Sequence, residues 1–249
     1  MSDLDAGIIV IGALAMALGG LVKGTIGMGL PMVAVAVMSS VLPVPLVLAI
    51  VSIPIVLTNI WQGFYAGLPL GPLRRFWPTI LTLLFGIWFG AALVAVIDPK
   101  LLFAIIGATV VVFSAFNLFR PTGVLPPKMA VWLGPVAGGA SGLLGGLSTI
   151  WGPPILMYFL ALRLKKEELV QTMGLVWTCG SPPLLVAYVH HGILTAENAP
   201  LAAYACGPAF LGLWFGQWLR RVIDEELFRK VILSFLILVG LNLIRRALF

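Results

Sequence analysis

The chain has 249 residues, of which 61% are hydrophobic and 10% are charged, and its mean hydropathy is +1.11. Soluble domains carry roughly 25% charged residues, so this composition excludes a soluble globular protein and predicts one embedded in a membrane. The net charge of +6 does not indicate nucleic-acid binding, because nearly all of the fifteen Lys and Arg lie in short gaps between apolar runs.

Ten apolar segments follow one another along the chain, and we expect each to form a helix. They are residues 7–22, 30–42, 46–65, 77–97, 101–119, 130–144, 150–162, 169–189, 200–219 and 228–248. The second and seventh are short: at 1.5 Å per residue each reaches about 20 Å, less than a hydrocarbon core of about 30 Å. Each follows a glycine-rich stretch, so we expect a helical hairpin that dips into the membrane, with a strongly tilted crossing as the alternative. The predicted fold class is an all-α integral membrane protein.

A lysine and a cluster of glycines interrupt the first apolar run. Residues 19–31 read GGLVKGTIGMGLP. A lysine at the centre of a membrane helix costs at least about 2.5 kcal/mol, so it persists where it faces a cavity, a partner or the interface. Glycine lets the backbone bend and lets a ligand approach it closely. We therefore predict a broken helix at a binding site; in the alternatives, Lys23 snorkels to the headgroups and the glycines serve close helix packing.

The fourth and ninth segments are related in sequence. Nine residues between Gly86 and Leu101 are identical to the residues 126 positions later, between Gly212 and Leu227. This similarity predicts an internal repeat within a single membrane domain, 1–249, with about five helical segments in each half, 6–120 and 129–249. We pair the glycine-rich residues 24–27 with 142–145, which requires an insertion in the second half.

The basic residues indicate how the segments are oriented. If the segments alternate between two sides, one side receives a large set of Lys and Arg and the other only Lys100, Arg245 and Arg246. The large set is Arg74, Arg75, Arg120, Lys128, Arg163, Lys165, Lys166, Arg220, Arg221, Arg229 and Lys230. The positive-inside rule makes its side cytoplasmic. Both termini are then expected outside, and the fourth and ninth segments run in opposite directions, which predicts an inverted-topology repeat.

Inverted repeats with paired short segments interrupted by Gly and Pro are typical of secondary transporters, whose site lies between the halves near the midplane. Helix N-termini and free backbone N–H groups present partial positive charge there, and Lys23 adds a full charge, so the predicted substrate is an anion. The candidate substrate-binding residues are Lys23, Gly24, Thr25, Gly27, Gly29, Asn59, Gln62, Ser148, Thr149, Trp151 and Thr178. As alternatives to substrate binding, the Ser and Thr hydroxyls in this set bond to the backbone of their own helix, and the Asn and Gln side chains lie at the membrane–water interface.

Several residue types are missing where other chemistry would need them. All Asp and Glu fall in predicted loops or tails, so no carboxylate relay in the membrane is expected, and no constellation for hydrolysis is present. We expect no enzyme activity, no cofactor and no metal, since the adjacent His190 and His191 lack further ligands. Cys179 and Cys206 lie in separate apolar segments, so no disulfide is expected. An anion leaving a cell gains about 2.3 kcal/mol per 100 mV, which favours export over import.

The glycine motif at 19–29, the second at 138–146 and the Pro that follows each resemble the TauE/SafE sulfite exporter family. The similarity extends over essentially the whole chain. It implies a multi-pass permease of the bacterial cytoplasmic membrane that exports sulfite or sulfonates such as sulfoacetate or sulfolactate. The alternatives are an ion-coupled importer of a related anion or carboxylate, and a non-transporting membrane subunit or channel. The expected partners are a small anion, the lipid bilayer and a second copy of the chain in a homodimer.

Overall fold

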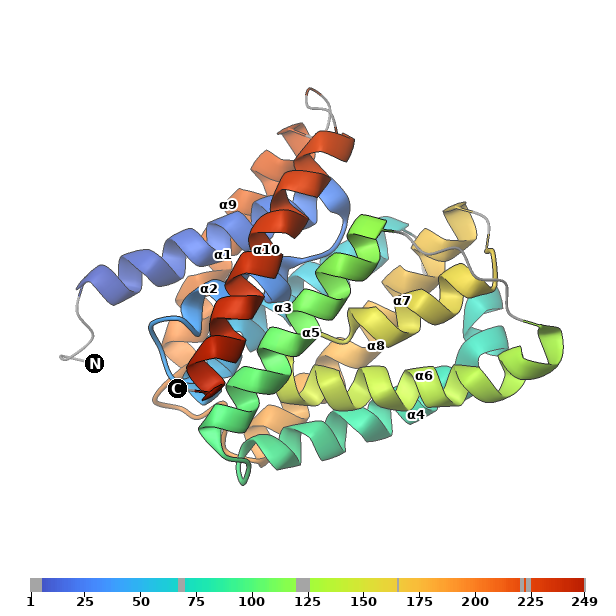
Figure 1. Ribbon diagram of the computed structural model, residues 1–249, viewed down its shortest axis with the longest axis horizontal. Helices are drawn as coiled ribbons and strands as arrows, with labels where there is room; N and C mark the ends of the chain where they lie inside the picture. The colour runs from blue at the N-terminus through green and yellow to red at the C-terminus, as the bar shows by residue number, and fades with distance from the viewer. Residues whose placement is uncertain are drawn as a thin grey trace.

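The computed structural model describes residues 6–66, 70–119, 126–164, 166–219, 222 and 225–248. Within these residues the chain forms ten α-helices and no strand (Figure 1). The helices are α1 (Ala6–Ile26), α2 (Leu30–Met38), α3 (Val44–Ala66), α4 (Leu70–Val94), α5 (Pro99–Phe119), α6 (Pro127–Ser148), α7 (Gly152–Ala161), α8 (Lys166–His190), α9 (Ala199–Leu219) and α10 (Glu225–Leu248). Each corresponds to one of the ten predicted segments, which confirms the all-α fold class.

Length and composition allow seven of the described helices to cross a membrane, namely α3, α4, α5, α6, α8, α9 and α10. The apolar part of α1, Ile9–Thr25, is slightly shorter. Many large apolar side chains stand on the outside of the molecule, among them Trp132, Trp214 and Phe89. A soluble protein cannot leave so much apolar surface in water, whereas lipid solvates it. The protein is therefore a multi-pass membrane protein.

The two short helices form hairpins with the helices that precede them. Along the first hairpin, Leu30 lies against Gly19 and Met38 lies near Gly12, so α2 folds back along α1. Along the second, the Ile155 backbone N–H donates a hydrogen bond to Ser141 Oγ over 2.9 Å, and α7 folds back along α6. Hairpins are thus observed in place of the alternative, tilted crossings.

The breaks are shorter than the glycine-rich stretches that predicted them. α1 continues as a helix through Lys23, Gly24 and Thr25, and α6 continues through the glycines at 138–146. These helical glycines pack against a neighbouring helix. A Cβ at position 24 would lie 2.3 Å from the Leu213 carbonyl oxygen of α9, and one at position 146 would lie 2.3 Å from the Ile87 carbonyl oxygen of α4. Small residues at such positions let two membrane helices approach closely.

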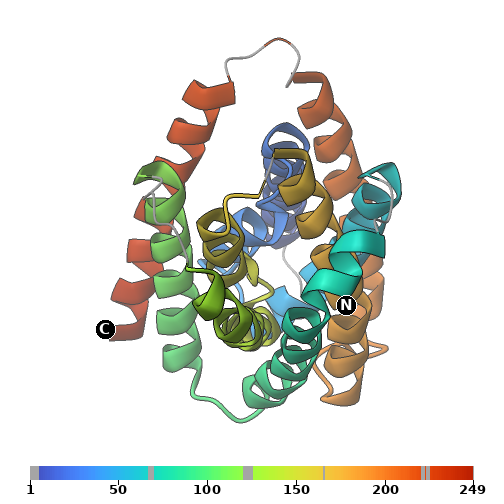
Figure 2. The same cartoon turned by 90° about the vertical axis from the view of Figure 1, so that its right-hand side faces the viewer.

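The helices of the two halves pair reciprocally. α1 packs parallel to α9, and α4 packs parallel to α6. Helices that occupy the same place in each half pair with each other, α3 with α8 and α5 with α10, and both of these pairs are antiparallel. Figure 2 shows α5 and α10 side by side along one flank, with α1, α6 and α7 between them and the opposite flank. A two-fold axis relating inverted halves would give this pairing.

The contacts also give the register between the halves. Gly20 and Gly24 meet α9 in the same way that Gly142 and Gly146 meet α4, so α1 corresponds to α6 at an offset of 122 residues (142 − 20 and 146 − 24). The sequence pairing of 24–27 with 142–145 is therefore wrong by one helical turn. In the corrected register the two breaks align without an insertion, and Gly27 corresponds to Thr149. Both residues have left-handed backbone, with φ of 90° and 61°.

Candidate functional site

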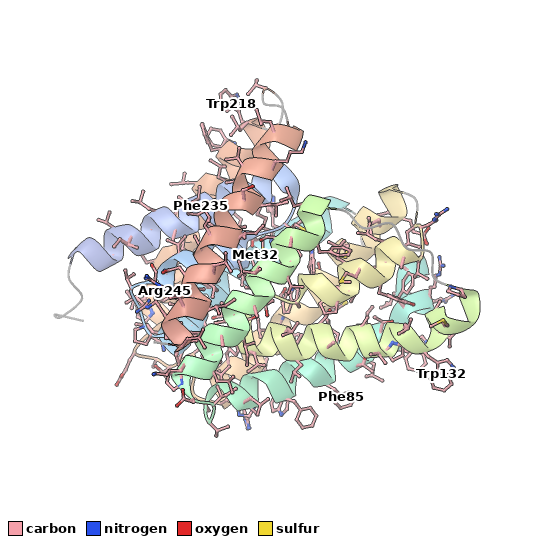
Figure 3. All side chains as sticks on the ribbon, viewed as in Figure 1. Met32, Phe85, Trp132, Trp218, Phe235 and Arg245 are labelled. Atoms are coloured by element: carbon pink, nitrogen blue, oxygen red, sulfur yellow. The ribbon has the colours of Figure 1, made fainter. Side chains whose placement is uncertain are left out.

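Both hairpin tips line one pocket in the middle of the molecule. The first break contributes Gly27, Met28 and Gly29, and the second contributes Thr149, Ile150 and Trp151. The remaining lining residues are Lys23, Pro31, Met32, Asn59, Phe113, Gly152 and Trp177. Met32 marks the position of the pocket in Figure 3, beside the α5–α10 pair. The cavity measures about 40 Å³, which is room for about three water molecules.

The breaks have their shape because three residues adopt left-handed backbone. Gly27 and Gly29 have φ of 90° and 110°, which only glycine adopts at little cost. Thr149 has φ of 61° despite its branched Cβ, an arrangement that costs about 1–2 kcal/mol. Strain of this kind concentrates at functional sites. α2 and α7 begin at these breaks, so the positive ends of their helix dipoles lie at the pocket. Few free amides add to this charge, because three residues of the first turns are prolines, which have no N–H, and the Ile155 N–H donates to Ser141 Oγ.

Lys23 is the charged residue of the pocket, and it is only 5% exposed. Its Nζ donates a hydrogen bond to Thr58 Oγ1 over 3.0 Å and a second, short one to Asn59 Oδ1. Both acceptors are neutral, and no carboxylate among the described residues pairs with Lys23. An ammonium has three N–H donors, so the third remains for a ligand.

Asn59 connects Lys23 to the second half of the chain. Its Nδ2 donates a hydrogen bond to Ser181 Oγ of α8 over 2.8 Å, and the Ser181 hydroxyl in turn donates to the Trp177 carbonyl. Thr178 Oγ1 contacts the Asn59 carbonyl at 3.3 Å. Lys23, Asn59 and Ser181 thus form one hydrogen-bonded chain across the α3–α8 contact.

Two further side chains hold the backbone at the breaks. Gln62 Nε2 donates to the Gly27 carbonyl over 2.9 Å, while the buried Gln62 Oε1 accepts no hydrogen bond from any residue that the structure describes. In the second break the Ser148 hydroxyl donates to the Leu144 carbonyl and accepts from the Ile150 N–H. Gln62 and Ser148 therefore hold the backbone of the two breaks in place without lining the pocket themselves.

The rest of the wall is apolar and aromatic. Trp151 and Trp177 stack with ring centroids 5.9 Å apart at an interplanar angle of 19°. Phe113 of α5 lies so close to Gly152 that a Cβ there would be 2.8 Å from its ring. Met28, Met32 and Ile150 complete this surface. Within the described part of the chain, the pocket thus has one cationic side chain, that of Lys23, and an otherwise largely apolar lining.

The predicted site residues fall into three groups. The pocket is lined by Lys23, Gly27, Gly29, Asn59, Thr149 and Trp151. Gln62, Ser148 and Thr178 support it from behind without lining it. Gly24 and Thr25 lie elsewhere: Gly24 packs against α9, and Thr25 Oγ1 donates to the carbonyls of its own helix. For these two residues the structure agrees with the alternative of helix packing and backbone bonding.

Sequence reasoning missed the apolar wall. Met28, Pro31, Ile150 and Gly152 adjoin predicted positions, so extending each break by a residue would have found them. Phe113 and Trp177 come from α5 and α8, where no motif distinguishes them from other aromatic residues in apolar helices. Among the described residues, no three His, Cys, Asp or Glu gather as a metal site would require. Cys179 and Cys206 are free thiols, as expected.

These features define an α-helical, multi-pass membrane protein with two broken hairpins around a cation-bearing pocket. A family model described as sulfite exporter TauE/SafE matches residues 12–243, nearly the whole chain. The chain therefore belongs to this family of membrane transporters, which confirms the resemblance seen in the glycine motifs. No curated protein and no solved structure matches the chain significantly.

Proposed function

We propose that the protein is a secondary transporter of the bacterial cytoplasmic membrane that exports a small sulfur-containing anion, sulfite or an organosulfonate. The substrate binds between the hairpin tips, beside Lys23 and the first turns of α2 and α7. Membership in the sulfite exporter family supports the class of substrate and the direction.

The burial of Lys23 without a carboxylate partner is the observation that carries this proposal. Removing an ammonium from water costs several kcal/mol, and hydrogen bonds to neutral Thr58 and Asn59 return only part of that. An anion at the third donor supplies the missing countercharge. The helix dipoles at the starts of α2 and α7 add partial positive charge to the same place.

The apolar wall favours an organosulfonate over inorganic sulfite. Lys23 is the one cation among the described residues of the pocket lining, and most of the remaining lining is apolar. A sulfonate with a short carbon chain would also bury that chain against Trp151, Trp177 and the neighbouring methionines, at about 25 cal/mol per Å² of apolar surface removed from water. Sulfite has no such group to bury.

Alternating access is the mechanism we propose for the inverted halves, 6–120 and 129–249. The hydrogen bond between Asn59 and Ser181 and the antiparallel α3–α8 and α5–α10 contacts lie where the halves meet. Because α1 also packs closely on α9 and α4 on α6, each moving unit combines helices of both halves. Movement of the α1–α9 unit against the α4–α6 unit about the α3–α8 contact would expose the pocket to each side in turn. The distribution of Lys and Arg supports a cytoplasmic side next to the α9–α10 link, with both termini outside.

Efflux from proteoliposomes tests the proposal. Vesicles loaded with sulfite or sulfoacetate should release either anion faster with the wild-type protein than without it, and an inside-negative potential should accelerate release. Lys23→Ala should lower the rate at least tenfold, while the exposed Lys100→Ala control should not. Equal rates for wild type and Lys23→Ala would remove Lys23 from the site. Accumulation driven only by a proton gradient would replace export with import, and flux without saturation or counterflow would indicate a channel.

A further inference from the structure

Two more pockets occupy equivalent places in the fold, and each is lined by both helices of one hairpin. The pocket at the second hairpin measures about 430 Å³ and lies between α4, α6 and α7. The pocket at the first measures about 40 Å³ and involves α1, α2, α3 and α9. α1 corresponds to α6 at an offset of 122 residues, so Ile9 and Ala13 of the smaller pocket correspond to Val131 and Pro135 of the larger. α4 corresponds to α9 at an offset of 126 residues, so Leu201 of the smaller pocket corresponds to Arg75 of the larger. The fold thus makes the same pocket twice.

The two pockets differ in their chemistry. Among the described residues, none that lines the smaller pocket is charged. The larger contains two guanidinium groups, Arg75 and Arg163, and two hydroxyl groups, Thr79 and Tyr158. The equivalents of Arg75 and Thr79 in the smaller pocket are Leu201 and Ala205. The fold itself does not require polar groups there, and the positive-inside rule places cations on this side of the membrane without requiring two of them to share one pocket.

The guanidinium groups of the larger pocket have N–H donors that are not bonded to described residues. Arg163 is exposed and makes no ion pair with any described residue. Arg75 Nη1 donates to Glu168 Oε1 of α8 over 2.7 Å, and its remaining N–H donors are not bonded to described residues. The ion pair is exposed, so it only partly neutralises the site. The Tyr158 hydroxyl donates its one proton to the Ala130 carbonyl, so it has no donor left for an anion.

Exposed aromatic residues place this pocket at the level of the lipid headgroups. Trp132, 77% exposed, follows the lining residue Val131, and exposed Trp77 lies between the lining residues Phe76 and Pro78. Figure 3 shows Trp132 at the periphery, at the start of α6. Tryptophan concentrates at the membrane–water interface. At the equivalent positions of the smaller pocket stand Val10 and Ala203. Val131 is itself exposed, so the larger pocket is open sideways to lipid.

We propose that Arg75 and Arg163 of the larger pocket bind an oxyanion, presented by the headgroup phosphate of an anionic phospholipid. Arginine forms paired hydrogen bonds with phosphate oxygens, and basic pockets between membrane helices on the cytoplasmic side suit such headgroups. The apolar residues Val131, Pro135 and Leu162 accommodate the start of the acyl chains. The same chemistry would hold a free oxyanion such as sulfate, and the test distinguishes the two sources. The site is separate from the central pocket and does not depend on transport.

Native mass spectrometry of the purified full chain in detergent tests the proposal, with added phosphatidylglycerol, phosphatidylcholine or inorganic sulfate. We expect retention of phosphatidylglycerol but not of phosphatidylcholine. Each of Arg75→Gln and Arg163→Gln should weaken that retention about fivefold, as expected for one basic side chain at an anionic surface. Arg74→Gln is the matched control, because it removes the same charge one residue away from the lining. Glu168→Gln controls for loss of the ion pair and should not weaken retention.

The outcomes separate the sources of the oxyanion. Loss of phosphatidylglycerol in the two lining variants, with Arg74→Gln unchanged, supports the lipid. Displacement by millimolar sulfate, or binding of sulfate alone that is lost in the same two variants, supports a free oxyanion. Equal effects of all three arginine variants would show general surface attraction and overturn the site, as would binding unchanged by Arg75→Gln and Arg163→Gln. Melting temperatures of all the variants show whether each is folded.

Discussion

Asn59 of α3 accepts a hydrogen bond from the Lys23 amino group and donates one to Ser181 of α8 over 2.8 Å. Asn59 and Ser181 are 122 residues apart, the same offset that relates α1 to α6. Lys23 of the first hairpin is therefore hydrogen-bonded to the Asn59–Ser181 pair, which lies at the contact between α3 and α8. A change at Asn59 can alter both the charge of the pocket and the α3–α8 contact about which we propose the α1–α9 and α4–α6 units to move.

Lys23→Met should abolish most anion transport and leave the fold intact. The variant keeps the length and apolar stem of the side chain but removes the charge-assisted hydrogen bond to the substrate, worth about 1.5–3 kcal/mol or roughly a tenfold to hundredfold loss of affinity. Its melting temperature should stay within a few degrees, because removal of a buried charge offsets the loss of hydrogen bonds to Thr58 and Asn59. Efflux rates and thermal melts measure the two effects. Wild-type efflux from the variant would contradict the role of Lys23.

Asn59→Asp should inhibit transport by supplying the countercharge that the substrate otherwise provides. A carboxylate at the position of Asn59 Oδ1 pairs directly with the Lys23 ammonium, so an incoming anion meets a neutral pair and a negative charge. We expect at least a tenfold rise in KM for efflux, with a melting temperature equal to or above that of the wild type.

The control for Asn59→Asp is Thr58→Val, which removes the other acceptor of Lys23 without adding charge. It should change KM by only a few fold. If Asn59→Asp transports as well as Thr58→Val does, the substrate does not bind as an anion beside Lys23.

Regular apolar patterns were sufficient to predict the helices and the two hairpins. The same patterns misplaced the breaks, because glycine suits both a bend and close packing, and a sequence does not show which use applies. Gly24 serves packing, whereas Gly27, three residues later, forms the bend. In the second half the bend falls on Thr149, a residue type that gives no such signal.

The site was predictable only where a residue was unusual for its segment. Lys23 was found because a charge in an apolar run is costly. Trp177 and Phe113 were missed because aromatic residues are ordinary in membrane helices, and only the packing of α5 and α8 brings them to the hairpin tips. Arg75 and Arg163 were read as orientation signals, since their shared pocket depends on contacts between α4 and α7.

Gly24→Ala and Gly146→Ala should destabilise the protein to a similar extent. In each variant the new Cβ would lie 2.3 Å from a backbone carbonyl oxygen, so two tightly packed helices must separate. Overpacking of this kind costs about 1–3 kcal/mol, which corresponds to a melting temperature lower by about 2–12 °C for a chain of this size. Gly207→Ala is the control, because a Cβ there meets nothing within 4 Å on the same helix α9. Equal stability of all three variants would contradict the close α1–α9 and α4–α6 contacts.

Trp177→Ala should change which anions are transported without removing transport. Its ring stacks on Trp151 and forms part of the apolar wall. In our proposal its loss therefore removes contacts with the carbon chain of an organosulfonate, while the sulfonate oxygens keep Lys23. We expect KM for a propyl or butyl sulfonate to rise about tenfold, in line with about 1–2 kcal/mol of lost burial, while KM for sulfite changes less than about twofold. Trp177→Phe keeps an aromatic wall and should retain most of the preference. Competition between sulfite and alkyl sulfonates in proteoliposome efflux measures it directly. A proportional loss for both anions would show that Trp177 supports the pocket as a whole, and the case for an organosulfonate over sulfite would then fail.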